Sequence, residues 1–179
     1  MEISNDLVAI KKTFLLSHHE SKEVDQLKYT LNMPWLKNLA SEAQPWRLVL
    51  TIEARRYDSQ YRQTWSPLEL KKAIQLLTKR INDKAWKHGA RRRDETLGWA
   101  VSMHLGAYKD HPHFHVVISA PERYSDEVIC EWVRDSLKRI NWLKDQFYVE
   151  SYAGPGIFAY LFHETTATLI PEACCKANP

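Results

Sequence analysis

Hydrophobic and polar residues alternate with a period of two in four segments of this chain, as they do in β-strands with one buried face. Two longer segments instead repeat apolar residues every three or four positions, which is typical of amphipathic helices. The predicted strands cover residues 47–53, 97–104, 111–119 and 145–152, and the predicted long helices cover residues 66–89 and 125–140. After a Gly-Pro-Gly break, one more helix is expected from residue 157 to about residue 166.

The order of these elements predicts an α+β fold. Strand, helix, strand, strand, helix, strand is the split βαβ pattern of a ferredoxin-like (RRM/palm-like) antiparallel sheet with both long helices on one face. The last helix would then lie on the open face of the sheet. We expect a helical extension over residues 1–45, the sheet domain over 46–170, and a frayed tail over 171–179.

The ends of the two long helices carry recognisable signals. Ser66 precedes Pro67, and Glu69 follows three residues after Ser66, which predicts an N-cap with a capping box. Gly89 is expected to end this helix. Ser125 is expected to cap the second helix.

The strand alternation also predicts which residues share the face that the long helices leave open. Bulky apolar side chains point to the helices, and the residues between them point the other way. On the open face this places small, polar and titratable residues: Thr51, Glu53, His104, His113 and His115.

A metal site is the chemistry that this face best supports. His113 and His115 would project from the same side of one strand, and two such imidazoles form a ready pair of nitrogen ligands for a divalent ion. A third ligand is needed for firm binding. His104 ends the strand that pairs with the histidine strand by a hairpin, and Glu53 competes with it for this role. Alternatively, the strand with His113 and His115 is simply histidine-rich or an adventitious metal site, His104 is a solvated histidine at a strand end, and Glu53 is simply exposed.

Composition limits the class of protein without choosing a partner. The chain has 179 residues with 44% hydrophobic and 26% charged residues, which is ordinary for a soluble globular domain. Its net charge of +3 permits a nucleic-acid partner. Arg91, Arg92 and Arg93 lie in a predicted loop and are either a phosphate-contacting patch or a solvated charge run.

The expected compartment is cytoplasmic (intracellular). The three cysteines form no CxxC pair, the N-terminus lacks the pattern of a signal peptide, and no apolar run approaches membrane-spanning length. We therefore expect no membrane partner.

The His113-Phe114-His115 strand resembles the signature of the HUH endonuclease superfamily, which includes rolling-circle replication initiators and relaxases. Those proteins also begin with a short apolar strand ending in Leu-Thr, similar to Leu50-Thr51 here. They place a nucleophilic tyrosine on a helix after the second long helix, and Tyr160 occupies that place.

The resemblance implies a metal-dependent, site-specific single-stranded DNA endonuclease (nickase/ligase). It implies Mn²⁺ or Mg²⁺ bound by His104, His113 and His115, and Tyr160 as a nucleophile that forms a 5′-phosphotyrosine link. The implied partner is single-stranded DNA or a hairpin origin of a plasmid, phage or mobile element, with a host or element helicase. Two positions depart from the family pattern: His104 stands where Glu is usual, and His163 where Lys is usual.

Other interpretations of the same residues stay open. Tyr160 could be a core aromatic residue, and Tyr152 is a weaker candidate nucleophile. The stretch from His111 to Val117 also resembles the signature of histidine-triad nucleotide hydrolases and transferases, in which a histidine attacks the α-phosphate without a metal. A third possibility is a non-catalytic single-stranded nucleic-acid-binding module that uses the arginine loop and aromatic stacking.

Overall fold

The computed structural model describes residues 46–55, 66–87, 95–106, 111–151, 158, 161–162 and 167–177. The predicted extension over residues 1–45 lies outside the described residues, as do the arginine loop, Tyr152, Tyr160 and His163.

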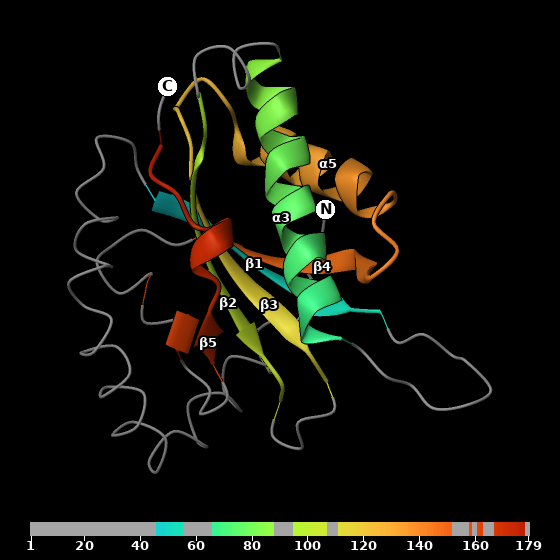
Figure 1. Cartoon of the computed structure of the whole chain (residues 1–179). Helices are drawn as coiled ribbons and strands as arrows, with labels where there is room; N and C mark the ends of the chain where they lie inside the picture. The colour runs from blue at the N-terminus through green and yellow to red at the C-terminus, as the bar shows by residue number, and fades with distance from the viewer. Residues whose placement is uncertain are drawn as a thin grey trace, which may run out of the picture.

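The described chain is an α+β structure built on a five-stranded antiparallel sheet with the strand order β4-β1-β3-β2-β5 (Figure 1). Its strands are β1 (Trp46–Ala54), β2 (Gly98–His104), β3 (His113–Ser119), β4 (Leu143–Ser151) and β5 (Thr168–Leu169). The first four strands lie within two residues of the predicted ranges, and their order is consistent with a ferredoxin-like arrangement. The sequence pattern did not predict β5, because a two-residue strand has no measurable alternation.

Two helices, α3 (Pro67–Trp86) and α5 (Asp126–Leu137), cover one face of this sheet (Figure 1). The strand residues that were predicted to point toward them do so, since Leu50, Val101 and Phe114 are all fully buried in the same core as Leu70 of α3 and Ile129 of α5. Among the described residues, this layer holds most of the buried hydrophobic side chains, whose removal from water stabilises the fold.

A smaller core lies on the opposite face of the sheet. Phe158, Leu161 and Phe162 are buried there against Val49, Val117 and one more strand residue, Ala100. These three residues belong to the predicted last helix, but they have the tighter 3₁₀ conformation instead of the expected α-helical one. Phe158 and Leu161 both pack against the sheet in this smaller core.

The predicted start and end of α3 were partly wrong. Ser66 does occupy the N-cap position, but its side chain makes no capping hydrogen bond. Glu69 instead pairs with Lys72 at 3.2 Å, so the predicted capping box does not form. The helix ends at Trp86, ahead of the predicted glycine, because Lys87 adopts a positive φ of 50° that cannot continue a right-handed helix.

The predicted cap of α5 is confirmed. The backbone N–H of Val128 donates to the hydroxyl of Ser125 at 3.4 Å, and two carboxylates, Asp126 and Glu127, follow in the first turn. Acidic side chains at this end of a helix interact favourably with its dipole.

The expectation of a frayed tail beyond residue 170 was wrong. The described chain continues as a 3₁₀ turn, η2 (Pro171–Ala173), and Cys175 then exchanges backbone hydrogen bonds of 2.8 and 3.0 Å with Trp99 of β2. Ile170 and Ala173 are buried in the helix-side core. The segment is held because its apolar residues complete that core while its backbone pairs with β2.

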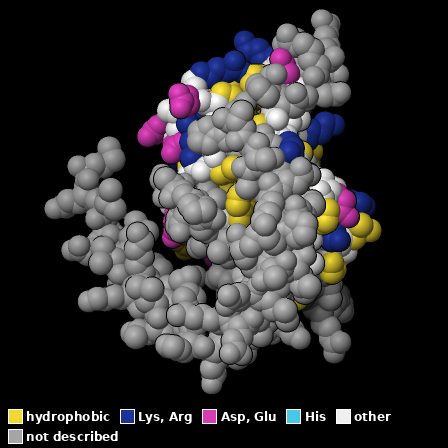
Figure 2. Space-filling view, turned by 90° about the vertical axis from the view of Figure 1, so that its left-hand side faces the viewer, with side chains coloured by type: hydrophobic (Ala, Val, Ile, Leu, Met, Phe, Trp, Pro, Cys, Tyr) yellow, Lys and Arg dark blue, Asp and Glu magenta, His cyan; other side chains and the backbone are white. Residues whose placement is uncertain are grey.

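Among the described residues, no helix is both long enough and apolar enough to cross a membrane. On the side of the molecule shown in Figure 2, the described basic and acidic side chains lie interspersed, with hydrophobic side chains visible between them.

Candidate metal centre

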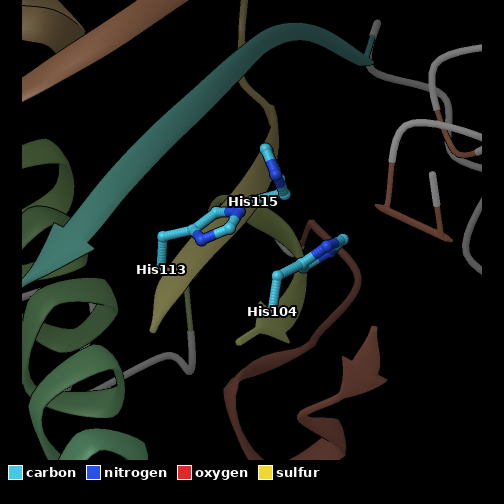
Figure 3. A group of neighbouring side chains, drawn as sticks. All are labelled: His104, His113 and His115. Atoms are coloured by element: carbon cyan, nitrogen blue, oxygen red, sulfur yellow. The ribbon is translucent and has the colours of Figure 1, made fainter. Parts of the chain in front are cut away.

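Three histidines from two neighbouring strands meet on the sheet face opposite the helices (Figure 3). His104 ends β2 and lies directly opposite His113 of β3, and His115 follows two residues later on the same side. One ring nitrogen from each residue lies within 4.8 Å of the others. His104 and His115 are buried, and His113 is partly exposed. The predicted group is therefore confirmed as one that can hold a metal ion.

The orientation of two of the rings is set by hydrogen bonds to backbone carbonyls. Nε2 of His104 lies 3.0 Å from the carbonyl oxygen of Leu161, and Nδ1 of His113 lies 3.0 Å from that of His111. A carbonyl oxygen only accepts, so in neutral rings these nitrogens carry the hydrogen and donate. The lone pairs are then on Nδ1 of His104 and Nε2 of His113, which are the nitrogens left to bind an ion.

The third ring is held by a side chain. Nδ1 of His115 lies 3.0 Å from the hydroxyl oxygen of Thr51, which can accept the Nδ1–H and so leave the lone pair on Nε2. Ser102 adds a contact of 2.9 Å from its hydroxyl to Nε2 of His104. Partners of this kind fix the tautomer and the direction of a metal-binding imidazole. The sequence pattern placed Thr51 on this face but did not reveal this role, which depends on the strand register.

The donor set fits a transition-metal ion. Three neutral imidazoles are nitrogen ligands, which suit ions such as Zn²⁺ best; Mn²⁺ binds them less strongly than Zn²⁺ but better than Mg²⁺, which prefers oxygen ligands. Three protein ligands also leave coordination positions for water or a substrate oxygen, as in catalytic metal sites.

Glu53, the competing third ligand, has a different partner. It lies opposite His113 in the pairing of β1 with β3, but its carboxylate forms an ion pair with Lys144 of β4. Within the described residues, His104 and not Glu53 completes the group of three potential ligands.

A groove of about 720 Å³ lies beside the exposed edge of the histidine group. It is lined by Thr51, Glu53, Ala54, Arg55, His111, Pro112, His113 and Lys144. Because His113 and Thr51 form part of its wall, a ligand in this groove would be next to a bound ion. Arg55 and Lys144 bring positive charge to the same groove, and Glu53, the ion-pair partner of Lys144, brings negative charge.

Next to this groove the sheet carries an exposed aromatic side chain. Tyr148 of β4 is 62% exposed, and it lies opposite Thr51, which itself lies opposite His115. Directly opposed residues of an antiparallel sheet share one face, so Tyr148 is on the histidine side, two strands from His115.

The described cysteines are not additional ligands at this centre. Burial raises the pKa of the Cys174 thiol to about 12, and its sulfur contacts the carbonyl oxygen of Ile170 at 3.1 Å. A thiol with so high a pKa stays protonated at neutral pH and is a poor ligand and nucleophile. Cys174 packs against the helix-side core, on the other side of the sheet from the histidines.

Tyr160, His163 and the three arginines at 91–93 lie outside the described residues, so their predicted roles stay predictions. Comparisons of the chain with protein-family models, with curated proteins and with solved structures found no match.

Proposed function

We propose that this protein is a metal-dependent endonuclease that nicks and rejoins single-stranded DNA through a 5′-phosphotyrosine intermediate on Tyr160, as its resemblance to HUH endonucleases implies. The observation that carries the proposal is the convergence of His104, His113 and His115 on the open sheet face, with ring nitrogens within 4.8 Å of one another. In the tautomers in which these ring nitrogens donate, the other nitrogen of each ring carries the lone pair that would bind an ion.

The nucleophile is supported by its neighbour in the chain. Leu161, the residue after Tyr160, is fully buried on the histidine face, and its carbonyl oxygen accepts from His104. Consecutive Cα atoms are about 3.8 Å apart. Tyr160 is therefore next in the chain to a residue that contacts a candidate metal ligand. This agrees with the expectation that the last helix lies on the open face of the sheet.

The chemistry proposed for the chain's own residues is a single displacement at phosphorus. The Tyr160 oxygen forms a bond to the phosphorus atom as the bond to the 3′ oxygen breaks, and the proton lost by the phenol is balanced by one gained by the leaving 3′ hydroxyl. A bound divalent ion would stabilise the charge on the phosphate oxygens. Residues three apart share one side of a helix, which is the conformation the sequence predicts here, so His163 is the residue proposed to orient the phosphate or to assist proton transfer.

The ion in this proposal is Mn²⁺ in preference to Mg²⁺. The resemblance implies either ion, but Mg²⁺ binds few imidazoles and holds its water ligands firmly. We expect activity with Mn²⁺ at concentrations where Mg²⁺ supports little. Imidazole binds an ion only when it is neutral, so activity should fall as the solution is acidified.

The proposed partner is single-stranded DNA or a hairpin origin, with the DNA crossing β1 and β4. Arg55 and Lys144 in the groove provide phosphate contacts, and Tyr148 provides a face on which a base can stack. Arg91, Arg92 and Arg93 are proposed as further phosphate contacts, and a helicase is the proposed protein partner.

The deciding experiment is incubation with a library of single-stranded DNA and Mn²⁺, followed by a denaturing gel and mass spectrometry of any covalent adduct. Tyr160→Phe removes only the hydroxyl, so this variant should bind metal and DNA yet form no adduct. Tyr152→Phe is the matched control and should behave as the parent. Cleavage that persists in Tyr160→Phe and disappears in Tyr152→Phe would identify Tyr152 as the nucleophile.

The same assay tests the two alternative functions. Phosphate-bond cleavage that continues in the presence of a chelator but is lost in His113→Ala would favour the histidine-triad hydrolase. DNA binding that needs Tyr148 and no metal, without any adduct, would favour the non-catalytic binding module.

A further inference from the structure

A second candidate site lies in a groove between α3 and α5, in the helical layer on the other side of the sheet from the histidines. It is lined by Arg80, Lys84, Asp135, Ser136, Lys138 and Arg139 and has a volume of about 240 Å³. Pockets for drug-sized ligands measure roughly 300–1,000 Å³, so this groove suits a smaller molecule.

Two buried polar atoms belong to residues that line this groove. Ser136 is 1% exposed, and its Oγ makes no hydrogen bond within the described structure. The Nε of Arg80 is also buried without such a bond. Buried polar groups in native proteins are nearly always hydrogen-bonded, so two such atoms at one groove call for an acceptor that can reach both.

The side chains around these two atoms are mainly cationic. Four residues, Arg80, Lys84, Lys138 and Arg139, are positively charged, and Asp135 is the one negatively charged residue among those lining the groove. Asp135 lies 3.3 Å from Lys84 and 3.8 Å from Lys138. Lys84 and the neighbouring cations hold the pKa of the Asp135 carboxyl below its usual range, which fits an excess of positive charge.

We propose that this groove binds a phosphate group, carried either by inorganic phosphate or by a small phosphate monoester. A phosphate offers several acceptor oxygens and can accept from the Ser136 hydroxyl and from the guanidinium of Arg80 at the same time. Its negative charge complements the three remaining cations. The groove shares no residue with the histidine centre, so this proposal does not depend on the proposed nuclease activity.

Calorimetric titration of the full chain with inorganic phosphate tests the proposal. The titration is done in chelator, so that no metal ion at the histidines can bind phosphate, and at constant ionic strength set with chloride. We expect saturable binding by the parent. Arg80→Gln should weaken it at least tenfold, since hydrogen bonds to charged groups are among the strongest polar contacts.

Lys72→Gln is the matched control, because Lys72 is a cation on the same helix that pairs with Glu69 away from the groove. It should bind phosphate as the parent does. Equal weakening in Arg80→Gln and Lys72→Gln, or no saturable binding by the parent, would overturn the proposal. Tighter binding of a nucleoside monophosphate than of phosphate would identify the monoester as the ligand, and weaker binding would identify the free ion.

Ser136→Ala provides a readout that a purely structural serine would not give. Without phosphate, the melting temperature of this variant should equal or exceed that of the parent, because the lost hydroxyl makes no hydrogen bond among the described residues. With saturating phosphate, the rise in melting temperature should be smaller than in the parent. A variant that melts lower without phosphate and gains the full increment with it would contradict the assignment of Ser136.

Discussion

The two faces of the sheet are made by the same strands but have opposite characters. In β3, Phe114 points to the helices and is fully buried among apolar side chains, while its neighbours His113 and His115 point to the other face and meet His104. The first face carries the larger apolar core, and the second combines a small apolar core with hydrogen-bonded polar groups. The helix-side face holds the larger hydrophobic core, and the other face offers the polar side chains that a functional site needs.

The histidine face is itself divided. Phe158, Leu161 and Phe162 cover it where Val49, Val117 and Ala100 lie, on β1, β3 and β2, whereas Tyr148 of β4 and the groove that Lys144 helps to line are open. His104 contacts the covered part through the carbonyl oxygen of Leu161, and His113 lines the groove of the open part. The covered part can therefore hold the ligand rings in place, while the open part leaves room for a substrate.

The largest expected effect comes from breaking the helix-side face. Phe114→Ala should lower the free energy of unfolding by about 3–5 kcal/mol, the usual cost of removing a buried phenylalanine. His113→Ala changes the adjacent residue on the partly exposed edge, and without metal it should cost about 1 kcal/mol or less. Urea unfolding of metal-free protein measures both values. Similar losses of unfolding free energy in the two variants would contradict the view that the helix-side face contributes more to stability than the histidine face.

A second prediction concerns the support of the metal ligands. Thr51→Val keeps the shape of the side chain but removes the acceptor for Nδ1 of His115, so Mn²⁺ affinity should fall about 10–100-fold, as is usual for such partners. His104→Ala removes a ligand and should cost more. Calorimetric Mn²⁺ titration compares them, with Thr51→Ser as the control that keeps the hydroxyl. Unchanged affinity in Thr51→Val would remove Thr51 from the site.

The smallest expected effect concerns the exposed half of the histidine face. Tyr148→Ala should weaken binding of single-stranded DNA about tenfold, since stacking of one base on an aromatic ring contributes roughly 1–3 kcal/mol. Tyr148→Phe should bind like the parent because it keeps the ring. Val149→Ala is the matched control on the helix side of the same strand, and fluorescence anisotropy measures all four proteins. Equal affinity of Tyr148→Ala and Val149→Ala would exclude the stacking role.

Much of the architecture could be predicted because strand periodicity is a local property. The alternation in residues 113–119 assigns Phe114 and His115 to opposite faces whatever the rest of the chain does. The same logic placed His104 on the histidine side, and the structure confirms that these three histidines meet. The ends of helices are harder to predict from sequence, as α3 shows, because a cap depends on the backbone geometry at one or two residues.

The sequence by itself determined which residues of each strand share a face and which residues of each helix form its apolar stripe. Both depend on spacings of two to four residues. Only the tertiary structure decided that Thr51 meets His115, that Leu161 meets His104, and that Cys175 pairs with Trp99. Each of these contacts joins residues more than 50 positions apart. They depend on strand register and on how the C-terminal segment packs, which are set by the whole core at once and leave no local pattern in the chain.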